Sequence, residues 1–294
     1  MDLPVGSIAA VISRVSLGPP RVRATIPSRR TKFFTKYFRQ NFSLPDSIMH
    51  YIEKNPKTWK LYQKMIQACK YFFVKNPILV VRYLYHNKDD LWCVDNRLLI
   101  DLKKIKCKFW VTKEFYVPRF PDVKNINPNI VSSNISKLYK CGASFLELGG
   151  QTISYHDLSF LISDAKEIVF EDVTVKDENG KILPLEKLIE ASIKAERIHI
   201  VGPTMTSKTF NELTKITHFA NLDSLTLYGL NEDFDVEDFY VYMKKNQRTK
   251  FKLWFDSSIS DGYKARIEEI IDEIKATKVF GYRRPSIEFD ELDE

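Results

Sequence analysis

The side chains that could carry out nucleophilic or metal chemistry are dispersed along the chain. They are His50, His86, His156, His199 and His218, and Cys69, Cys93, Cys107 and Cys141. The cysteine spacings match no C-x-x-C metal site and no compact disulfide framework, so we expect ordinary buried thiols in a reducing compartment. The sequence also lacks a phosphate-binding loop, a G-x-G-x-x-G motif, a G-x-S-x-G elbow and an H-E-x-x-H motif. We therefore predict no catalytic residue, no metal ligand and no cofactor.

Two polar clusters have a structural interpretation beside the chemical one. His156 and Asp157 follow Ser154, and a capped, solvated helix start explains their presence. The acidic run at 171–180 lacks the ligand spacing of a calcium loop, so we predict a solvated turn around Asn179 and Gly180. An enzyme site built across loops, including a Cys–His pair, stays an open alternative because it depends on convergence in space. No residue in the sequence is singled out for it.

The positive charge of the chain is concentrated at its amino end. The 294 residues carry a formal net charge of +7, and residues 1–40 contain eight basic side chains against one acid. The remaining residues are therefore neutral overall, which argues against the basic folded face that nucleic-acid binding needs. We predict a basic disordered tail over 1–41, with a mitochondrial transit peptide as the alternative. No apolar run is long enough to cross a membrane.

Residues 42 to 86 have a helical pattern. Pro45 suits a first helical turn, Ile48 and Ile52 recur at helical spacing, and Asn55-Pro56 ends the segment. A second helix is predicted from Thr58 through Phe73, with an apolar stripe formed by Leu61, Met65, Ala68, Cys69 and Phe72. The apolar segment at 76–87 is too short to assign to a helix or a strand. Residues 87–128 are predicted to be a linker with one strand at 107–117.

Beyond residue 129, five strand-like segments alternate with helix-like segments. The predicted inward pairs are Leu146/Leu148, Ile168/Phe170, Ile198/Ile200, Leu225/Leu227 and Leu253/Phe255. The helix-like segments have start signals at Ser154, Pro184, Thr206 or Ser207, and Asp235. One strand-plus-helix unit cannot bury its own faces, so the units are expected to stack along a shared parallel sheet. Leu222, Leu225 and Leu227 have the L-x-x-L-x-L spacing of a leucine-rich repeat.

The predicted fold is therefore α/β. It consists of the tail at 1–41, a helical module at 43–86, the linker at 87–128, and an irregular leucine-rich-repeat-like β/α solenoid with a parallel sheet at 129–294. A final helix at 263–276 and the segment after it are expected to cover the last strand, because an open stack needs atypical terminal elements.

The helical module resembles an F-box. The resemblance is carried by Leu44-Pro45 at the start of the first helix, Ile48 and Ile52 on its apolar face, Asn55-Pro56 at the turn, and Cys69-Lys70 followed by Phe72 and Phe73. The stretch from Pro56 to Cys69 is longer than usual by about one helical turn, and Lys57 and Thr58 replace a common acid. The order of the two parts is similar to lineage-expanded F-box-type families with divergent repeat tails.

The resemblance implies a substrate-recruiting adaptor of a cullin-RING (SCF-type) ubiquitin ligase, without enzymatic activity, in the cytoplasm or nucleus. The module would bind a Skp1-type adaptor through Leu44, Pro45, Ile48, Ile52, Leu61 and Met65, and the solenoid would hold an unidentified protein target. The alternative is a repeat scaffold without a ligase link, in which the helical module only caps the solenoid. That alternative predicts that Leu44, Pro45 and Ile48 are covered.

Alternation along the strands places one set of side chains on the outer face of the sheet. The predicted target-binding residues are Glu147, Val169, His199, Thr226, Tyr228 and Trp254. Tyrosine and tryptophan anchor interfaces because they cover a large area with few rotatable bonds. Two alternatives remain, namely that a loop covers this column or that Trp254 packs at the end of the solenoid. The sequence does not predict an oligomeric state.

Overall fold

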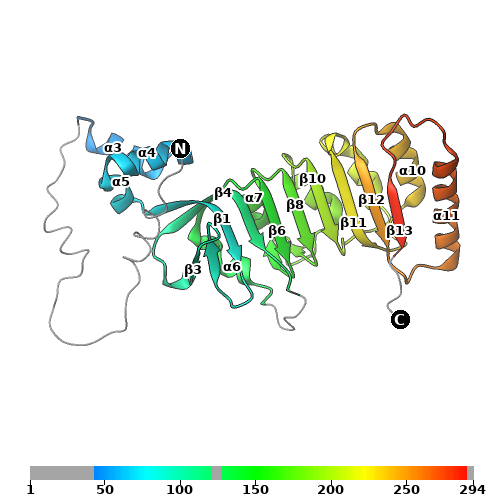
Figure 1. The fold of residues 1–294 in the computed structure, drawn as a ribbon, viewed down its shortest axis with the longest axis horizontal. Helices are drawn as coiled ribbons and strands as arrows, with labels where there is room; N and C mark the ends of the chain where they lie inside the picture. The colour runs from blue at the N-terminus through cyan, green and yellow to red at the C-terminus, as the bar shows by residue number, and fades with distance from the viewer. Residues whose placement is uncertain (1–42, 121–126, 290–294) are drawn as a thin grey trace. The chain divides into compact units, whose positions relative to one another are not determined.

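The computed structural model describes residues 43–120 and 127–289, so the predicted tail lies outside the described residues (Figure 1). The chain divides into two compact units, of which the first comprises residues 1–80 and 103–108 and the second comprises 81–102 and 109–294. The fold is mixed α/β with a mostly parallel central sheet. The fold class predicted from the sequence is confirmed at this level.

The helices begin and end as follows. The α-helices are α3 (Asp46–Lys54), α4 (Trp59–Ala68), α5 (Lys70–Lys75), α6 (Ile130–Asn134), α7 (Tyr155–Ile162), α8 (Leu185–Ala191), α9 (Thr209–Lys215), α10 (Val236–Lys245) and α11 (Asp261–Ala276). The short 3-10 helices are η1 (Leu102–Lys104), η2 (Ile135–Lys137) and η3 (Phe219–Asn221).

The strands form one sheet of eleven and one of two. The large sheet contains β1 (Ile78–His86), β2 (Trp92–Val94), β3 (Leu98–Ile100), β4 (Lys108–Val117), β5 (Leu138–Cys141), β6 (Phe145–Gly149), β8 (Glu167–Glu171), β10 (Arg197–Val201), β11 (Ser224–Leu230), β12 (Lys250–Phe255) and β13 (Ser286–Phe289). The small sheet pairs β7 (Thr152–Ser154) with β9 (Thr174–Lys176).

The first unit is a small helical module built around Tyr62. This side chain is fully buried, and its hydroxyl donates to the carbonyl of Asn76 at 2.5 Å and accepts from the amide of Ile78 at 3.2 Å. Asn76 Nδ2 in turn donates to the carbonyl of Glu53 at 2.7 Å. These bonds fix the end of α3 and the start of β1 to α4, which stabilises a unit that has few buried apolar side chains.

The helix predicted from Thr58 is two helices. The Thr58 hydroxyl caps the start by accepting from the amide of Leu61 at 3.2 Å, as the sequence indicates. Cys69, however, is extended at φ −149° and ψ 123°, and its sulfur accepts from the amide of Tyr71 at 3.4 Å. The helix therefore ends at Ala68, and the continuous apolar stripe predicted through Cys69 and Phe72 does not form.

The second unit is organised by parallel strands in register. The order from one edge is β13, β12, β11, β10, β8, β6, β4, β1, β2 and β3, with β5 also paired to β4. The inward residues align as Leu146, Ile168, Ile198, Leu225 and Phe251, and as Leu148, Phe170, Ile200, Leu227 and Leu253. All ten are buried. Each such side chain stabilises the fold by about 1.5–3 kcal/mol through removal from water.

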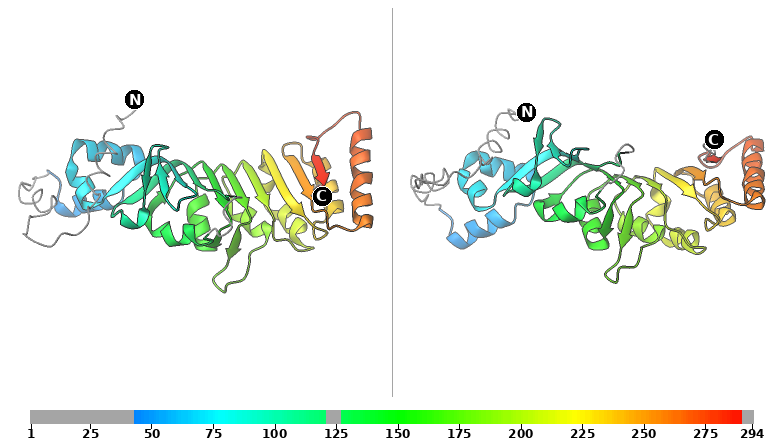
Figure 2. Two further views of the ribbon diagram at one scale, coloured as in Figure 1. Left: turned by 60° about the horizontal axis from the view of Figure 1, so that its bottom comes forward. Right: turned by 90° about the horizontal axis from the view of Figure 1, so that it is seen from below.

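Among the described residues of the second unit, helices cover one face of this sheet and leave the other open (Figure 1, Figure 2). In Figure 2 the helices from α7 to α10 lie on one side of the sheet, and in Figure 1 they lie behind the strands. Two of the predicted caps are confirmed, since Ser154 Oγ accepts from the amide of Asp157 at 3.1 Å and Asp235 Oδ1 accepts from Asp238 at 2.9 Å. Helix α9 begins at Thr209, later than the predicted start.

Successive strands end in the same way. The residue just after β6, β8 and β10 has a positive φ, at Gly150, Asp172 and Gly202 respectively. The amides of Gly150 and Gly202 each donate to the next strand, to Glu171 O at 2.8 Å and Tyr228 O at 3.0 Å. The left-handed conformation, which glycine adopts freely, thus turns each strand while keeping its lateral hydrogen bond.

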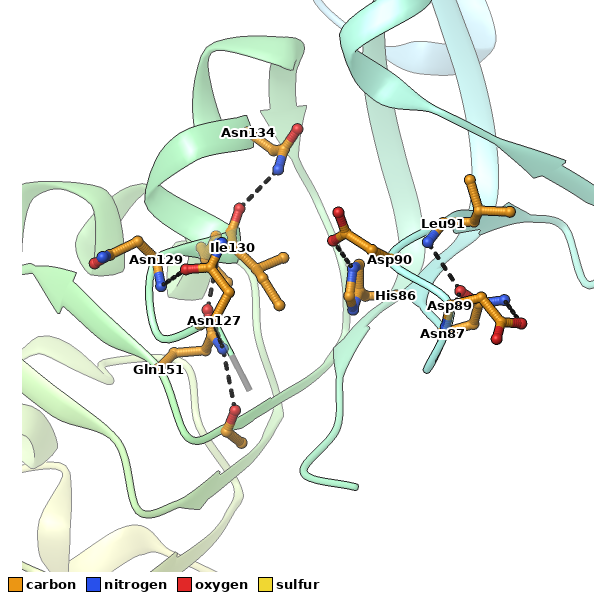
Figure 3. A network of polar contacts seen from close by, with 12 residues as sticks. His86, Asn87, Asp89, Asp90, Leu91, Asn127, Asn129, Ile130, Asn134 and Gln151 are labelled. Atoms are coloured by element: carbon orange, nitrogen blue, oxygen red, sulfur yellow. Dashed lines mark hydrogen bonds and ion pairs between the residues drawn. The ribbon is translucent and has the colours of Figure 1, made fainter. Parts of the chain in front are cut away.

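Buried polar side chains tie loops to the sheet (Figure 3). Gln151 is 1% exposed, its Oε1 accepts from the amide of Val131 at 3.2 Å, and its Nε2 donates to Asn127 O and Gly149 O at 3.2 Å. The same figure shows His86 Nε2 bonded to Asp90 Oδ1 at 3.0 Å in the turn after β1. Satisfied buried groups of this kind hold loops in one conformation.

The structure also differs from the expected organisation in the stretch at 87–128 and in the register of β12. The stretch at 87–128, expected to be a linker with one strand, contributes β2, β3 and β4 to the large sheet. The other difference is the register of β12, where Phe251 and Leu253, instead of Leu253 and Phe255, lie opposite Leu225 and Leu227. Phe251, Leu253 and Phe255 alternate at the same period, so the apolar pattern alone fits both registers.

Gly149 is required by close packing, and this can be tested. A Cβ built at Gly149 would lie 2.2 Å from the amide nitrogen of Arg119, whereas one built at Gly262 meets nothing within 4 Å. We expect Gly149→Ala to lower the free energy of unfolding by about 1–3 kcal/mol through overpacking. Gly262→Ala in helix α11 is the control and should be neutral or stabilising. Urea denaturation followed by circular dichroism measures both, and an unchanged midpoint for Gly149→Ala would contradict the prediction.

Candidate functional site

The open face of the second unit carries a row of side chains that cross the sheet. Strand register places Tyr116, Glu147, Val169, His199, Thr226 and Lys252 side by side on β4, β6, β8, β10, β11 and β12. The neighbouring row contains Glu171, Val201 and Tyr228. These side chains alternate with the buried inward residues, so the pleat of the strands sets their orientation. We call the outward surface of β4 to β12 the open face.

Aromatic rings stack along the carboxyl ends of three strands on this face. The ring centroids of His199 and Tyr228 are 5.0 Å apart at an interplanar angle of 25°, and those of Tyr228 and Trp254 are 4.1 Å apart at 12°. Trp254 Nε1 donates to Glu288 Oε2 at 3.0 Å on strand β13. The rings are half-buried and fixed by their neighbours, so they form a preorganised surface with polar edges.

The other part of the open face is acidic. Burial, and then the negative charge of Glu171, raise the pKa of Glu147 to about 7, while a hydrogen bond from Tyr116 acts in the opposite direction. Burial also raises the pKa of Tyr116, to which the charge of Glu147 adds. Burial lowers the pKa of His199, partly offset by Glu171. Glu147 therefore titrates near neutral pH, whereas His199 is neutral there.

A shallow pocket lies at the end of the open face next to strand β1. Its volume is about 300 Å³, and its lining includes Tyr83, Tyr85, Asn96, Glu114, Tyr116 and Glu147. Strands β1, β4 and β6 and the turn after β2 supply these residues. The pocket combines aromatic rings with two carboxylates.

The predicted target-binding residues all lie on the open face, but they form two groups. His199, Tyr228 and Trp254 belong to the aromatic stack, whereas Glu147 and Val169 lie toward the acidic end. Thr226 is only 9% exposed. Trp254 does not lie opposite Thr226, because the register of β12 places Lys252 there and Trp254 beside Tyr228.

The sequence did not predict several residues of the open face and of the pocket beside it. Tyr116 and Glu114 belong to β4, which confirms the strand predicted at 107–117 but which was assigned to a linker outside the sheet, and Tyr83 and Tyr85 belong to an unassigned apolar segment. The signal was present, because polar and apolar residues alternate from Glu114 to Val117 as they do in β6. Lys252 was missed because of the register of β12.

The first unit has its own exposed apolar surface. Leu44, Ile48 and Leu61 are 46%, 45% and 45% exposed, and Pro45 is exposed as well. Met49 and Glu53, which are four residues apart on α3, face inward instead. The predicted adaptor-binding residues Ile52 and Met65 are half-buried. We call Leu44, Pro45, Ile48 and Leu61 the helical-module patch.

The groups with potential for covalent or metal chemistry lie apart. In residues 43–120 and 127–289, no group of three or more His, Cys, Asp or Glu side chains could hold a metal ion. All four cysteines are thiols, and Cys93, Cys107 and Cys141 are buried. Burial raises the pKa of Cys141 to about 12, so its thiol stays protonated. The acidic run at 171–180 forms a turn in which Asp177 Oδ1 accepts from the amides of Asn179 and Lys181.

Comparison of the chain with protein-family models, with curated proteins and with solved structures gave no match. Among the described residues, no helix has the length and apolar character needed to cross a membrane.

The titration of Glu147 makes stability depend on pH. Its pKa is 4.5 in a free side chain and about 7 in the folded chain, so the folded state holds the proton more tightly. The stabilisation is complete below about pH 4.5 and is lost as the pH rises through about 7. We expect the free energy of unfolding in urea to fall by about 1–2 kcal/mol over this pH range, a value reduced for solvent screening of the half-buried side chain. The Glu147→Gln variant should not show this fall.

Two further variants test the cause of this decline. Glu171→Gln should shift it to lower pH, since one repelling charge is removed, and Glu178→Gln in the exposed turn should leave it unchanged. A wild-type decline that persists in Glu147→Gln would contradict the assignment.

The aromatic stack predicts an energetic coupling between Tyr228 and Trp254. In a double-mutant cycle with Tyr228→Leu and Trp254→Leu, we expect a coupling of about 0.5–1.5 kcal/mol beyond the lost area. Val169→Ala with Trp254→Leu is the control, because β10 and β11 separate the two strands and the effects should add to within about 0.5 kcal/mol. Equal couplings in the two cycles would show that the stack contributes nothing specific.

Proposed function

We propose that this chain is a non-enzymatic, substrate-recruiting adaptor of an SCF-type ubiquitin ligase. The first unit is an F-box-like module that binds a Skp1-type adaptor through the helical-module patch. The second unit is a leucine-rich-repeat-like β/α solenoid whose open face holds a protein target. Such an adaptor would act in the cytoplasm or nucleus.

The exposure of the helical-module patch is the observation that carries the proposal. A unit of this size buries Met49 and Tyr62 but leaves Leu44, Pro45 and Ile48 in contact with solvent. Removing exposed apolar side chains of this kind from water favours association with another apolar surface. Within the first unit itself these side chains are not covered, so they are available to a partner, and this supports the adaptor proposal.

Features of the second unit support a role in holding a protein. Five strands of the large sheet, from β6 to β12, align an inward apolar pair in register, which supports a stacked repeat. Ion pairs also link neighbouring strand-plus-helix repeats. They join residues 25 to 30 positions apart, such as Arg197 with Glu167 and Arg248 with Asp223. The open face presents rigid aromatic rings with polar edges, and these are the side chains enriched at interface centres.

Binding of a Skp1-type protein can be tested by co-precipitation with the full chain. We expect Leu44→Asp and Ile48→Asp to weaken recovery by about ten-fold or more, because a charge would be buried at the anchor. The matched control is Ile193→Asp, which changes an equally apolar side chain that is 72% exposed in the second unit. Circular dichroism should show that all three variants are folded. Equal recovery of the Skp1-type protein by wild type and both patch variants would remove the ligase assignment.

A further inference from the structure

We propose that the pocket at the β1 end of the open face binds an arginine side chain of the target protein. This inference rests on the proposed function, because it assumes that the open face holds the target, and it specifies the chemistry of one contact. Its occupant is a guanidinium group on a protein segment that lies across strands β4 and β6.

The size of the pocket suits one side chain. A volume of about 300 Å³ is at the lower limit of pockets that enclose small molecules. The pocket is open to solvent, since Glu114 and Asn96 are exposed and the three tyrosines are half-buried. A long side chain projecting from a bound segment can enter such a site.

The lining is complementary to a guanidinium group in shape and charge. Tyr85 and Tyr116 present aromatic rings, on which a guanidinium stacks favourably, and Glu114 and Glu147 supply carboxylates. Within the described ranges, neither carboxylate is in an ion pair with a basic side chain. The basic residues beside the pocket are engaged elsewhere, since the Arg82 guanidinium on β1 lies 5.4 Å from the centre of the Tyr83 ring and Arg119, just after β4, pairs with Asp172.

A cation in the pocket would also relieve an unfavourable interaction. Glu147 is half-buried next to the charge of Glu171, and both conditions disfavour its ionised form. A guanidinium within hydrogen-bond distance stabilises the ionised form of Glu147. Binding of the partner therefore turns an unfavourable carboxylate charge into a favourable one.

The walls of the pocket are held in place before any partner binds. Asp95 Oδ1 accepts from the amides of Arg82 and Tyr83 at 2.8 and 3.0 Å, and the Asp95 amide donates to Tyr83 O at 3.0 Å. Thr112 Oγ1 donates to Val81 O at 3.0 Å, and the Ser144 amide donates to Lys113 O at 2.8 Å. These bonds fix β1, β4 and β6 to one another, which reduces the entropy lost on binding.

The arginine side chain can be tested directly with a small probe. We would titrate N-acetyl-arginine methylamide into the full chain at about pH 8, above the pKa of Glu147, and follow the labelled tyrosine rings by NMR. One isolated side chain should bind with a Kd of about 1–10 mM and shift the resonances of Tyr83, Tyr85 and Tyr116. The N-acetyl-citrulline methylamide probe has nearly the same shape without the charge and should produce no saturable shift.

Variants assign the binding to the carboxylates. Glu114→Gln and Glu147→Gln should each weaken the arginine probe by about ten-fold, whereas Glu178→Gln should not change it. Glu114 is exposed, so its variant keeps the test valid even if Glu147→Gln alters the fold. The proposal is overturned if no tyrosine shifts, if citrulline binds as well as arginine, if N-acetyl-lysine methylamide binds more tightly, or if the shifts occur at Trp254 instead.

These outcomes are separate from a failure of the proposed function. The probe reports on the pocket alone, whereas co-precipitation of the Skp1-type protein depends on Leu44 and Ile48 in the other unit. Loss of the arginine shifts with normal co-precipitation would overturn only the pocket, and the reverse result would overturn only the ligase assignment.

Discussion

The parallel register of the strands from β6 to β12 is the constraint on which the rest of the second unit depends. Each inward pair, such as Leu146 and Leu148, packs against the equivalent pair of the next strand and is buried by the helices behind it. A single strand-plus-helix repeat could not bury these side chains, so the stack gains most of its stability from contacts between successive repeats. A shift by one residue would exchange the core for the open face.

The character of the open face follows from this register. Because side chains alternate across a strand, fixing the apolar pairs inward places Glu147, His199 and Tyr228 outward at once. The described helices of the second unit cover one side of the sheet (Figure 2), so within this unit the outward side chains meet mainly one another and solvent. Rings from successive strands come within stacking distance, as Tyr228 and Trp254 do at 4.1 Å. The strand ends are turned by residues with positive φ, such as Gly202, which keep lateral hydrogen bonds intact.

The two units have complementary physical properties. The first contains few buried side chains and exposes Leu44 and Ile48, which suits association with another apolar surface. The second has an extensive core and an outward face of aromatic and acidic groups, which suits directional recognition. This contrast is the basis for assigning adaptor binding to one unit and target binding to the other. The polar side chains of the open face, including Glu147 with its raised pKa, therefore belong to a binding surface in this proposal.

The sequence by itself determined the local features. Two-residue and helical periodicity located β6, β8, β10 and β11, capping residues located the starts of α7 and α10, and Asn55-Pro56 ended the first helix, because each depends on nearby residues. Only the tertiary structure decided the register of β12, where Phe251, Leu253 and Phe255 fit two alignments equally well. It also decided that β1 and β4 join the large sheet, where they contribute Tyr83, Tyr85 and Tyr116 to the pocket. Pairing between residues far apart in the chain depends on which surfaces meet, and local patterns do not encode that choice.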